Sequence, residues 1–309
     1  MAEMHNTGIL LESGTNEIEI MEFTIDGNLY GINVAKVKEI MIAAPVKPMP
    51  HAHVAVEGIY KPRDEVLTVV DLPKYLNGEN HNKGERDIFI ITNFNKMFIA
   101  FRVHSVVQIS RISWTDIQKP DKAVSGGAES VATGIAQCGD DLVTILDFER
   151  IVAEIAPETS IQIEEIESLG PRNRNEKPIW IAEDSILLSK MIEDSLRKAG
   201  YVNLRMYPNG RELWDALNLL PKEQPVTQHV GLIITDIEMP QMDGHRLTKL
   251  VKDNERYKGI PLIIFSSLIS EEMRIKGCQL GADEQLTKPE IGHLVSVMDH
   301  LLVRAAQEQ

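Results

Sequence analysis

The sequence predicts two domains of different class: a mostly β domain followed by an α/β domain with a doubly wound parallel sheet. The chain has 309 residues, which exceeds the usual size of one domain. Short alternating or β-branched runs fill residues 17–148, whereas from 177 onward short apolar runs alternate with apolar residues at helical spacing. Between them, residues 170–178 (GPRNRNEKP) have the Gly, Pro and polar composition of a linker.

An internal repeat organises the β half. Residues 58–72 (GIYKPRDEVLTVVDL) and 134–148 (GIAQCGDDLVTILDF) match in residue type at an offset of 76. A second alignment, at an offset of 69, pairs Ile32, Val34, Val37 and Ile40 with Phe101, Val103, Val106 and Ile109. Two copies are fewer than a solenoid needs, so we expect a closed pair of small barrels. The alternative is convergence of ordinary strand patterns.

Individual residues of the β half carry further expectations. Asp26-Gly27 separates two apolar runs, and Asp-Gly suits the positive dihedrals of a tight hairpin turn. Edge strands offer backbone groups and apolar side chains for partner pairing, but for Ile40, Val69 and Val70 we expect burial in the barrel cores.

The C-terminal half alternates strand and helix. Helices are predicted for 185–199 and for about 291–306. Short buried strands are predicted at 179–182, 202–206, 231–235 and 262–265, with a short fifth strand before Lys288. Ligands of such sheets bind outside the carboxyl ends of the strands, so side chains that follow the strands are candidate functional residues.

Five polar residues follow these strands: Glu183, Asp184, Asp236, Ser266 and Lys288. Three carboxylates that lie close together repel one another, and a hard cation such as Mg²⁺ would neutralise them. If one carboxylate attacked a phosphoryl group, the metal, the lysine and the serine hydroxyl could stabilise the transferring oxygens. The sequence therefore predicts a magnesium-dependent phosphoryl-transfer site.

The motifs IAED, LIITDIEMPQMDG, PLIIFSS and GADEQLTKP resemble, in order and spacing, those of two-component receiver domains, over residues 177–308. The resemblance implies that Asp236 is the phosphoacceptor. It also implies Mg²⁺ ligands from Glu183, Asp184, Asp236 and the backbone carbonyl of Glu238, and phosphoryl contacts from Ser266 and Lys288. A haloacid dehalogenase phosphatase is the rival, but there the nucleophile precedes the acidic pair within a DxD motif.

The C-terminal half departs from the receiver pattern on both sides of Lys288. Receivers often place an aromatic residue three positions before the conserved lysine, where the ring moves inward upon phosphorylation, and this chain has Gln285 there. Glu290 likewise stands where an aromatic residue is common. The usual aromatic switch is therefore in doubt.

The N-terminal half resembles the CheW-like coupling domains of bacterial chemotaxis. The resemblance rests on FTIDGNLYGINVAKVKEI, VEGIYKPRDEVLTVVDL, IAFRVHSVVQI and VTILDF and covers about residues 17–155. It implies two packed five-stranded barrels, in agreement with the repeat. It also implies a partner-binding role for Arg63, although Pro62 and Asp64 replace the commoner Leu and Gly.

Charge and composition exclude several functions. Net charge is −14, and residues 1–175 hold 16 basic and 26 acidic side chains, so nucleic acid is an unexpected partner. The sequence has no apolar run long enough to span a membrane and no signal peptide, which favours the cytoplasm. Cys138 and Cys278 have no metal-binding spacing, and we expect both to be buried free thiols.

Together the two resemblances match the layout of the CheV family of chemotaxis coupling proteins. We expect a CheW-like domain at 15–157, an acidic linker at 158–176 and a receiver at 177–309. The implied function is a non-enzymatic adaptor, located at receptor arrays, that couples chemoreceptors to the CheA histidine kinase and is regulated at Asp236. The alternatives are a phosphate sink that drains the kinase, a constitutive adaptor with a degenerate receiver, and an oligonucleotide-binding pair of barrels.

Overall fold

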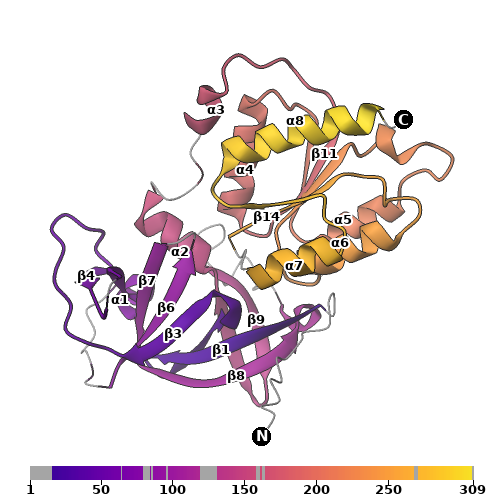
Figure 1. Cartoon of the computed structure of the whole chain (residues 1–309). Coiled ribbons are helices and arrows are strands. Elements are labelled where there is room, and N and C mark those ends of the chain that lie inside the picture. Colours follow the sequence, from indigo (N-terminus) through magenta and orange to yellow (C-terminus); the bar gives the residue numbers. More distant parts are fainter. Residues whose placement is uncertain are drawn as a thin grey trace, which may run out of the picture.

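The computed structural model describes residues 16–63, 65–78, 84, 86–94, 97–118, 131–157, 161, 164–267 and 271–307. A β domain is followed by an α/β domain, as predicted (Figure 1). No helix within these ranges is both long and apolar enough to cross a bilayer.

The β domain consists of two five-stranded sheets. The first contains β1 (Glu17–Ile25), β2 (Asn28–Asn33), β8 (Ser105–Ser113), β9 (Ala132–Cys138) and β10 (Asp141–Leu146), in the order β8-β1-β2-β10-β9. The second contains β3 (Val37–Ile42), β4 (Val56–Tyr60), β5 (Leu67–Asp71), β6 (Ile88–Phe94) and β7 (Met97–Val103), in the order β3-β6-β7-β5-β4. Short 3₁₀ helices η1 (Val34–Lys36) and η2 (Trp114–Asp116) follow β2 and β8.

The hairpin and the repeat are confirmed. β1 and β2 pair antiparallel around Asp26 and Gly27, whose φ angles are 50° and 80°. In the repeat, hairpin β4–β5 leads into α1 (Leu72–Asn77) and hairpin β9–β10 leads into α2 (Phe148–Ile155). Each helix is capped by an aspartate side chain, Asp71 or Asp147, which accepts a hydrogen bond from the backbone three residues on.

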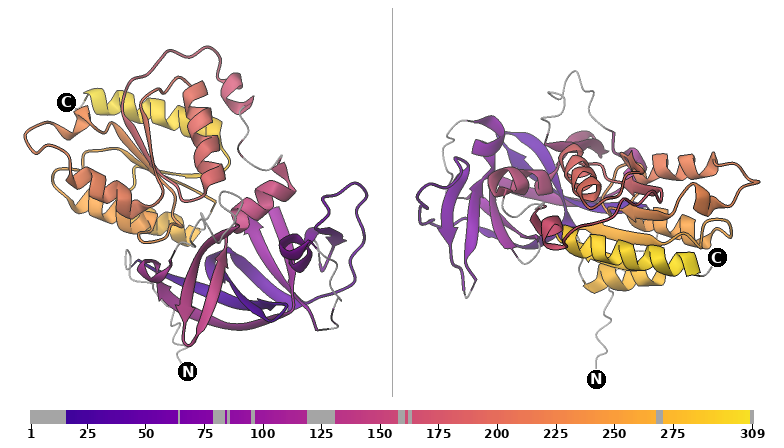
Figure 2. Two further views of the ribbon diagram at one scale, coloured as in Figure 1. Left: turned by 180° about the vertical axis from the view of Figure 1, so that it is seen from behind. Right: turned by 90° about the horizontal axis from the view of Figure 1, so that it is seen from above.

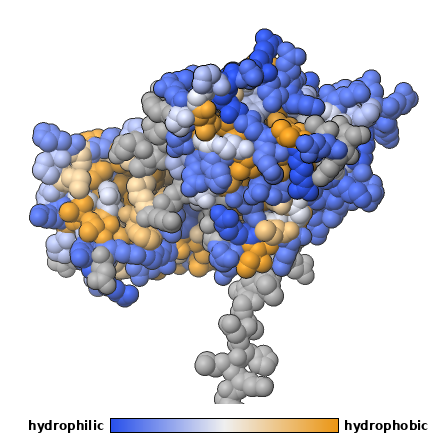
Figure 3. Space-filling view, turned by 45° about the horizontal axis from the view of Figure 1, so that its top comes forward, coloured by the Kyte–Doolittle hydropathy of each residue, from blue (hydrophilic) through white to orange (hydrophobic). Residues whose placement is uncertain are grey.

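Burial corrects two expectations. Val69 and Val70 are buried, as predicted, but Ile40 is 48% exposed. The reason is its position on β3, one of the two edge strands of the second sheet, where Ile42 is also exposed. Apolar side chains are visible on the surface of the β domain in Figure 3. Cys138 is buried, whereas Cys278 is exposed.

The α/β domain has five parallel strands in the order β12-β11-β13-β14-β15, the flavodoxin-like order of a doubly wound sheet. They are β11 (Ile179–Ala182), β12 (Leu204–Tyr207), β13 (Leu232–Thr235), β14 (Leu262–Ser266) and β15 (Glu284–Thr287). The helices are α4 (Ile186–Lys198), α5 (Gly210–Asn218), α6 (Gly244–Asp253), α7 (Glu271–Gln279) and α8 (Ile291–Gln307), with the 3₁₀ turn η5 (Val226–Gln228). Helices cover both faces of this sheet (Figure 2).

The acidic connection between the domains is partly packed rather than fully solvated. Ile161 and Ile166 are buried in the core formed with α4 and α8, and Ile166 belongs to the short helix α3 (Glu164–Ser168). The Glu165 carboxylate accepts a hydrogen bond from the backbone N–H of Gly292 at 2.9 Å. This end of the connection is therefore attached to α8.

Candidate functional site

The fold brings the predicted site residues together at the carboxyl edge of the parallel sheet. Glu183 and Asp184 follow β11, and Asp236 follows β13; one oxygen from each lies within 4.8 Å of the others. Lys288 follows β15, with its Nζ 2.8 Å from Glu183 Oε2 and 3.0 Å from Asp236 Oδ2. Ser266, the last residue of β14, is fully buried beside this group, and its carbonyl accepts a hydrogen bond from the Lys288 N–H.

Local backbone contacts hold Asp236 in place. Its Oδ1 accepts a hydrogen bond from the Ile237 N–H at 2.7 Å, and its carbonyl accepts one from the Thr235 hydroxyl at 2.8 Å. Gly244, at the start of α6, packs against the same carbonyl. The DIEMPQMDG segment is thus the loop that folds back over the phosphoacceptor candidate.

Burial and crowding of the carboxylates dominate the electrostatics. Burial raises the pKa of Glu183 to about 8, assisted by repulsion from Asp236 and Glu149 and opposed by Lys288. Burial alone would lower the pKa of Lys288, but the surrounding carboxylates raise it well above its ordinary value. One ammonium facing this many carboxylates leaves an excess of negative charge.

That excess fits a divalent cation. Glu183, Asp184 and Asp236 offer three carboxylate oxygens within 4.8 Å of one another, which are the hard ligands that Mg²⁺ prefers. Burial, together with repulsion from Asp236 and Glu149, raises the pKa of Glu183, so a cation placed beside it would favour its ionised form. A bound Mg²⁺ would neutralise the carboxylates and later the oxygens of a phosphoryl group.

Two charged residues of the β domain complete this site, and the sequence did not single them out. Lys36 lies in η1, and its Nζ is 3.3 Å from Glu149 Oε1 and also pairs with Glu238. Glu149 lies in the first turn of α2, with Oε2 3.6 Å from Lys288 Nζ and a hydrogen bond from the Ser267 side chain. Lys288 and Lys36 lower the pKa of Glu149 to about 2 against the opposing effect of burial, so this carboxylate is ionised.

The repeat contained a signal for these residues. At the offsets of 76 and 69, Glu149 corresponds to Pro73 and Lys36 corresponds to Ser105. The two copies thus differ in charge at the positions where one of them meets the α/β domain. Neither difference between the two copies changes the strand pattern. The alignment of the repeats alone therefore did not indicate a role for Lys36 or Glu149.

Polar contacts extend the junction between the domains. Asn16 donates through Nδ2 to the carbonyl of Gln241 and accepts through Oδ1 from the Asp243 N–H, both at 2.9 Å. The Gln241 N–H donates to the carbonyl of Trp114 at 2.8 Å. Asn33 also donates to the Glu238 carboxylate. The β domain therefore covers the loop that carries Asp236.

The space that remains at the phosphoacceptor candidate is small. A cavity of about 30 Å³ lies between the domains and is lined by residues of both, including Lys36, Glu149 and Asp236. A cavity of this size holds roughly two water molecules. Asp236 itself is only 4% exposed.

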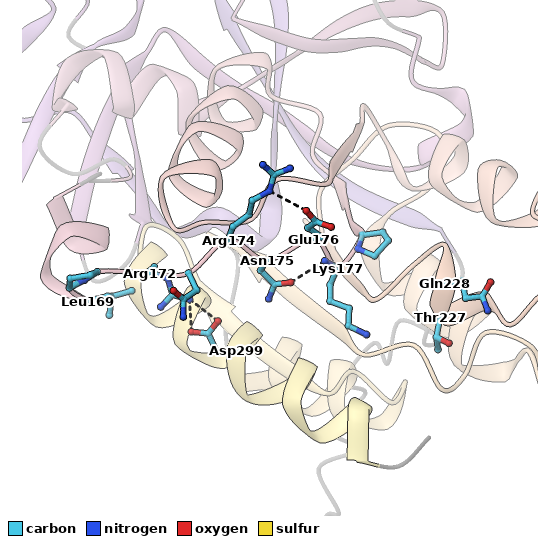
Figure 4. Close-up of a pocket in the computed structure, with 12 residues that line it drawn as sticks. Leu169, Arg172, Arg174, Asn175, Glu176, Lys177, Thr227, Gln228 and Asp299 are labelled. Atoms are coloured by element: carbon cyan, nitrogen blue, oxygen red, sulfur yellow. Dashed lines mark hydrogen bonds and ion pairs between the residues drawn. The ribbon is translucent and has the colours of Figure 1, made fainter.

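A larger hollow of about 810 Å³ lies elsewhere, between the connection and the start of β11 (Figure 4). Four of its charged groups form two pairs: Arg172 with Asp299 at 2.6 Å, and Arg174 with Glu176 at 3.2 Å. None of the five predicted residues at the strand ends lines it.

The remaining predicted positions lie apart from the acidic cluster. Gln285 is buried on β15, and its Nε2 donates to the Arg274 carbonyl of α7 at 2.8 Å and to Cys278 Sγ at 3.4 Å. Arg63 is exposed on the β domain, and its neighbour Asp64 falls outside the described residues.

Both halves of the chain match known domain families. The CheW-like domain family matches residues 19–156, and the response regulator receiver domain family matches 179–299. The chain is 30% identical over 287 residues to chemotaxis protein CheV3 of Helicobacter pylori, covering 88% of this chain and 91% of that protein. Chemotaxis protein CheV2 of that organism is 28% identical, with coverages of 89% and 92%. The crystal structure of the scaffolding protein TtCheW from Thermoanaerobacter tengcongensis gives a TM-score of 0.39 at 21% identity, covering 47% of this chain and 90% of that one.

Proposed function

The chain belongs to the CheV family of chemotaxis proteins, and from this premise we propose that it couples chemoreceptors to a CheA-type histidine kinase under control of phosphorylation at Asp236. It is a chemotaxis coupling adaptor with a phosphorylatable receiver. The observation that carries the phosphorylation half is the convergence of Asp236, the acidic pair Glu183–Asp184 and Lys288 at one edge of the sheet. The adaptor is proposed to act at receptor arrays.

The chemical step is a transfer between two side chains. A carboxylate oxygen of Asp236 attacks the phosphorus of the kinase phosphohistidine, the P–O bond forms as the P–N bond breaks, and the imidazole leaves with the electron pair and takes up a proton. Lys288 and the Ser266 hydroxyl would stabilise the transferring oxygens. Glu183, Asp184, Asp236 and the Glu238 carbonyl would hold Mg²⁺.

The edge strands of the two sheets support the adaptor half. β3 and β8 are edge strands, and each exposes apolar side chains: Ile40 and Ile42 on β3, Val107 and Ile109 on β8. Ile40 and Ile109 are also equivalent in the repeat. Exposed edges with apolar side chains are suited to strand pairing with a partner. We propose that the kinase and the receptors bind at these edges, with Arg63 contributing a charged contact.

Phosphotransfer tests the receiver half. The full chain is incubated with radiolabelled, phosphorylated CheA and Mg²⁺, and we expect label on the wild type and none on Asp236→Asn. Asp253→Asn, which changes an exposed carboxylate at the end of α6, is the matched control and should retain the label. Chelation of Mg²⁺ should abolish transfer. Equal labelling of Asp236→Asn and wild type would refute Asp236 as the acceptor.

Pull-down tests the adaptor half. We expect Ile40→Lys and Ile109→Lys to weaken capture of the kinase or of receptor cytoplasmic fragments. Arg63→Ala should also weaken capture, because it removes the charged contact proposed for Arg63. Leu142→Lys is the control, because Leu142 is 68% exposed but lies on β10, an interior strand. Unchanged capture by both edge variants would remove the proposed surface.

A phosphate sink is the second candidate function. It is favoured by Gln285, whose side chain is tied to α7 where other receivers have a mobile aromatic ring. A sink requires receptor–kinase coupling to be the same in wild type and Asp236→Asn. Kinase activity in reconstituted receptor assemblies separates the two functions, since a regulated adaptor predicts a difference.

A further inference from the structure

The phosphoacceptor face of the receiver is covered by the chain's own CheW-like domain. Asp236 is 4% exposed, and the adjoining cavity of about 30 Å³ is lined by residues of both domains. In Figure 1, α2 lies between the two sheets of the β domain and the receiver. In this arrangement the junction with the CheW-like domain restricts the approach of a phosphorylated histidine of a second protein to Asp236.

The placement of Glu149 follows from the packing of α2. Phe148 is fully buried, with its ring centroid 4.8 Å from Phe101 and 6.3 Å from Phe23, and Ile151 is also fully buried. These contacts fix the first turn of α2 on the β domain. Glu149, between the two buried residues, is thereby directed at the receiver.

Glu149 contacts groups that a phosphoryl group on Asp236 would need. Its carboxylate lies 3.6 Å from Lys288 Nζ and accepts a hydrogen bond from Ser267, next to Ser266. Lys288 is at the same time 3.0 Å from Asp236. The carboxylate of Glu149 is therefore an internal anion placed beside the cation that the phosphoryl oxygens would use.

Lys36 joins the domains by charge. Its ammonium contacts Glu149 of its own domain and Glu238 of the receiver, and its side chain is 10% exposed. Lys36 is the cation that Glu149 and Glu238 share across the junction, and removing one partner of a buried charge pair is costly. Lys36 therefore stabilises the closed arrangement.

The other contacts between the two domains are compatible with the domains moving apart. None of the five apolar core clusters among the described residues combines the β sheets with the receiver. The contacts from Asn16, Asn33 and Trp114 are hydrogen bonds, which water can replace. Polar interfaces between domains of one chain permit relative motion.

Resting on the function proposed above, we propose that the CheW-like domain is a reversible lid on the phosphoacceptor site, held by Lys36 and Glu149, and that a phosphoryl group on Asp236 displaces Glu149 and keeps the domains apart. A phosphoryl group carries nearly two negative charges and three terminal oxygens. The cavity holds roughly two waters, and Glu149 and Glu238 would repel the added charge. Phosphorylation would then signal through separation of the two domains, which requires no aromatic residue at position 285.

The rate of phosphorylation tests the lid. The full chain with Mg²⁺ is phosphorylated by phosphoramidate, a small donor that removes the need for a docking partner, and initial rates are compared for wild type, Glu149→Gln and Lys36→Met. We expect both variants to react at least about tenfold faster, because each removes one partner of a buried charged contact. Lys38→Met is the control: its exposed pair with Glu65 lies on the same domain away from the receiver, and its rate should equal that of wild type.

Solution scattering gives an independent readout. Beryllium fluoride with Mg²⁺ mimics the phosphoryl group, and we expect it to increase the radius of gyration of wild type but not of Asp236→Asn. Lys36→Met should be expanded without it. Wild type that is phosphorylated as fast as both variants and keeps its radius would overturn the lid while leaving the proposed function intact. If neither the wild type nor any variant became phosphorylated, the phosphoacceptor function would be overturned, and the lid with it.

Discussion

Gly244 packs so closely against Asp236 that a Cβ at position 244 would lie 1.8 Å from the Asp236 carbonyl oxygen. The contact joins the start of α6 to the residue that follows β13, and the Gly244 N–H also donates to the carbonyl of Ile237 at 2.9 Å. The glycine of the sequence MDG is therefore required by the close backbone of the loop that begins at Asp236 rather than by any turn dihedral.

Replacing this glycine should disturb both stability and phosphorylation. We expect Gly244→Ala to lower the free energy of unfolding by about 2 kcal/mol or more, since backbone must move to admit the methyl group. Urea denaturation and label yield from phosphoramidate measure the two effects. Gly259→Ala is the control, because a Cβ there meets nothing within 4 Å, and its change should stay within about 0.5 kcal/mol.

A buried charge cluster in the second sheet should be a larger determinant of stability than exposed pairs. Arg102 pairs with Glu57 through two bonds of 2.8 and 3.0 Å and with Asp87 at 3.2 Å. Arg102→Met would remove the guanidinium that both carboxylates contact, and we expect a loss of about 3–5 kcal/mol. Arg111→Met breaks an exposed pair with Glu17 and should cost below about 1 kcal/mol. Similar losses in urea denaturation would contradict this ranking.

His245 should make the receiver sensitive to acid. Burial, with a smaller contribution from Lys276, lowers the pKa of His245 to about 3, so the folded state binds a proton less readily than the unfolded state. Its stabilising contribution is complete above the unfolded pKa of about 6.5 and is lost as the pH falls towards 3, by about 2 kcal/mol between pH 7.5 and 5.0.

The prediction is checked by comparing unfolding free energies at pH 7.5 and 5.0 for wild type and His245→Gln. Other groups titrate in both proteins, so the difference between them isolates His245. The variant should lose about 2 kcal/mol less than wild type over this interval. His293→Gln, which changes an exposed histidine of α8, should behave as wild type.

The two cysteines should differ in reactivity. Cys278 is exposed on α7, whereas Cys138 is buried, and burial together with Glu22 raises the pKa of Cys138 to about 11. A thiol reagent at pH 7.5 should therefore label one equivalent rapidly, and Cys278→Ser should abolish that rapid phase. Guanidinium should expose the second thiol. Two rapid equivalents in the folded protein would show that Cys138 is accessible.

The sequence predicted which residues meet at the carboxyl edge of the parallel sheet, because their placement there depends on strand order alone. Glu183, Asp236, Ser266 and Lys288 each follow or end a parallel strand, and the topology brings such positions to one edge. The internal repeat likewise predicted two similar β units, because its matched residues are core and capping positions such as Asp71 and Asp147.

The sequence could not predict what depends on the docking of one domain upon the other. In the sequence, Lys36 and Glu149 are indistinguishable from solvated surface charges, and only the packing of the receiver against the β domain buries them. The predicted burial of Ile40 was wrong for a related reason. Alternation of apolar residues shows that a strand has an apolar face, but not whether another element covers that face. Gln285 was recognised as a departure, whereas its attachment to α7 required the structure.

The docked connection limits how far the domains can separate. α2 ends at Ile155 and Ile161 is already buried in the receiver core, so only residues 156–160 join the two bodies. Five residues span about 18 Å at full extension. Such a tether keeps the lid at a high effective concentration near its site, on the order of millimolar. Reclosure after loss of the phosphoryl group is then a unimolecular event, with an equilibrium independent of how many copies of the protein a cell contains.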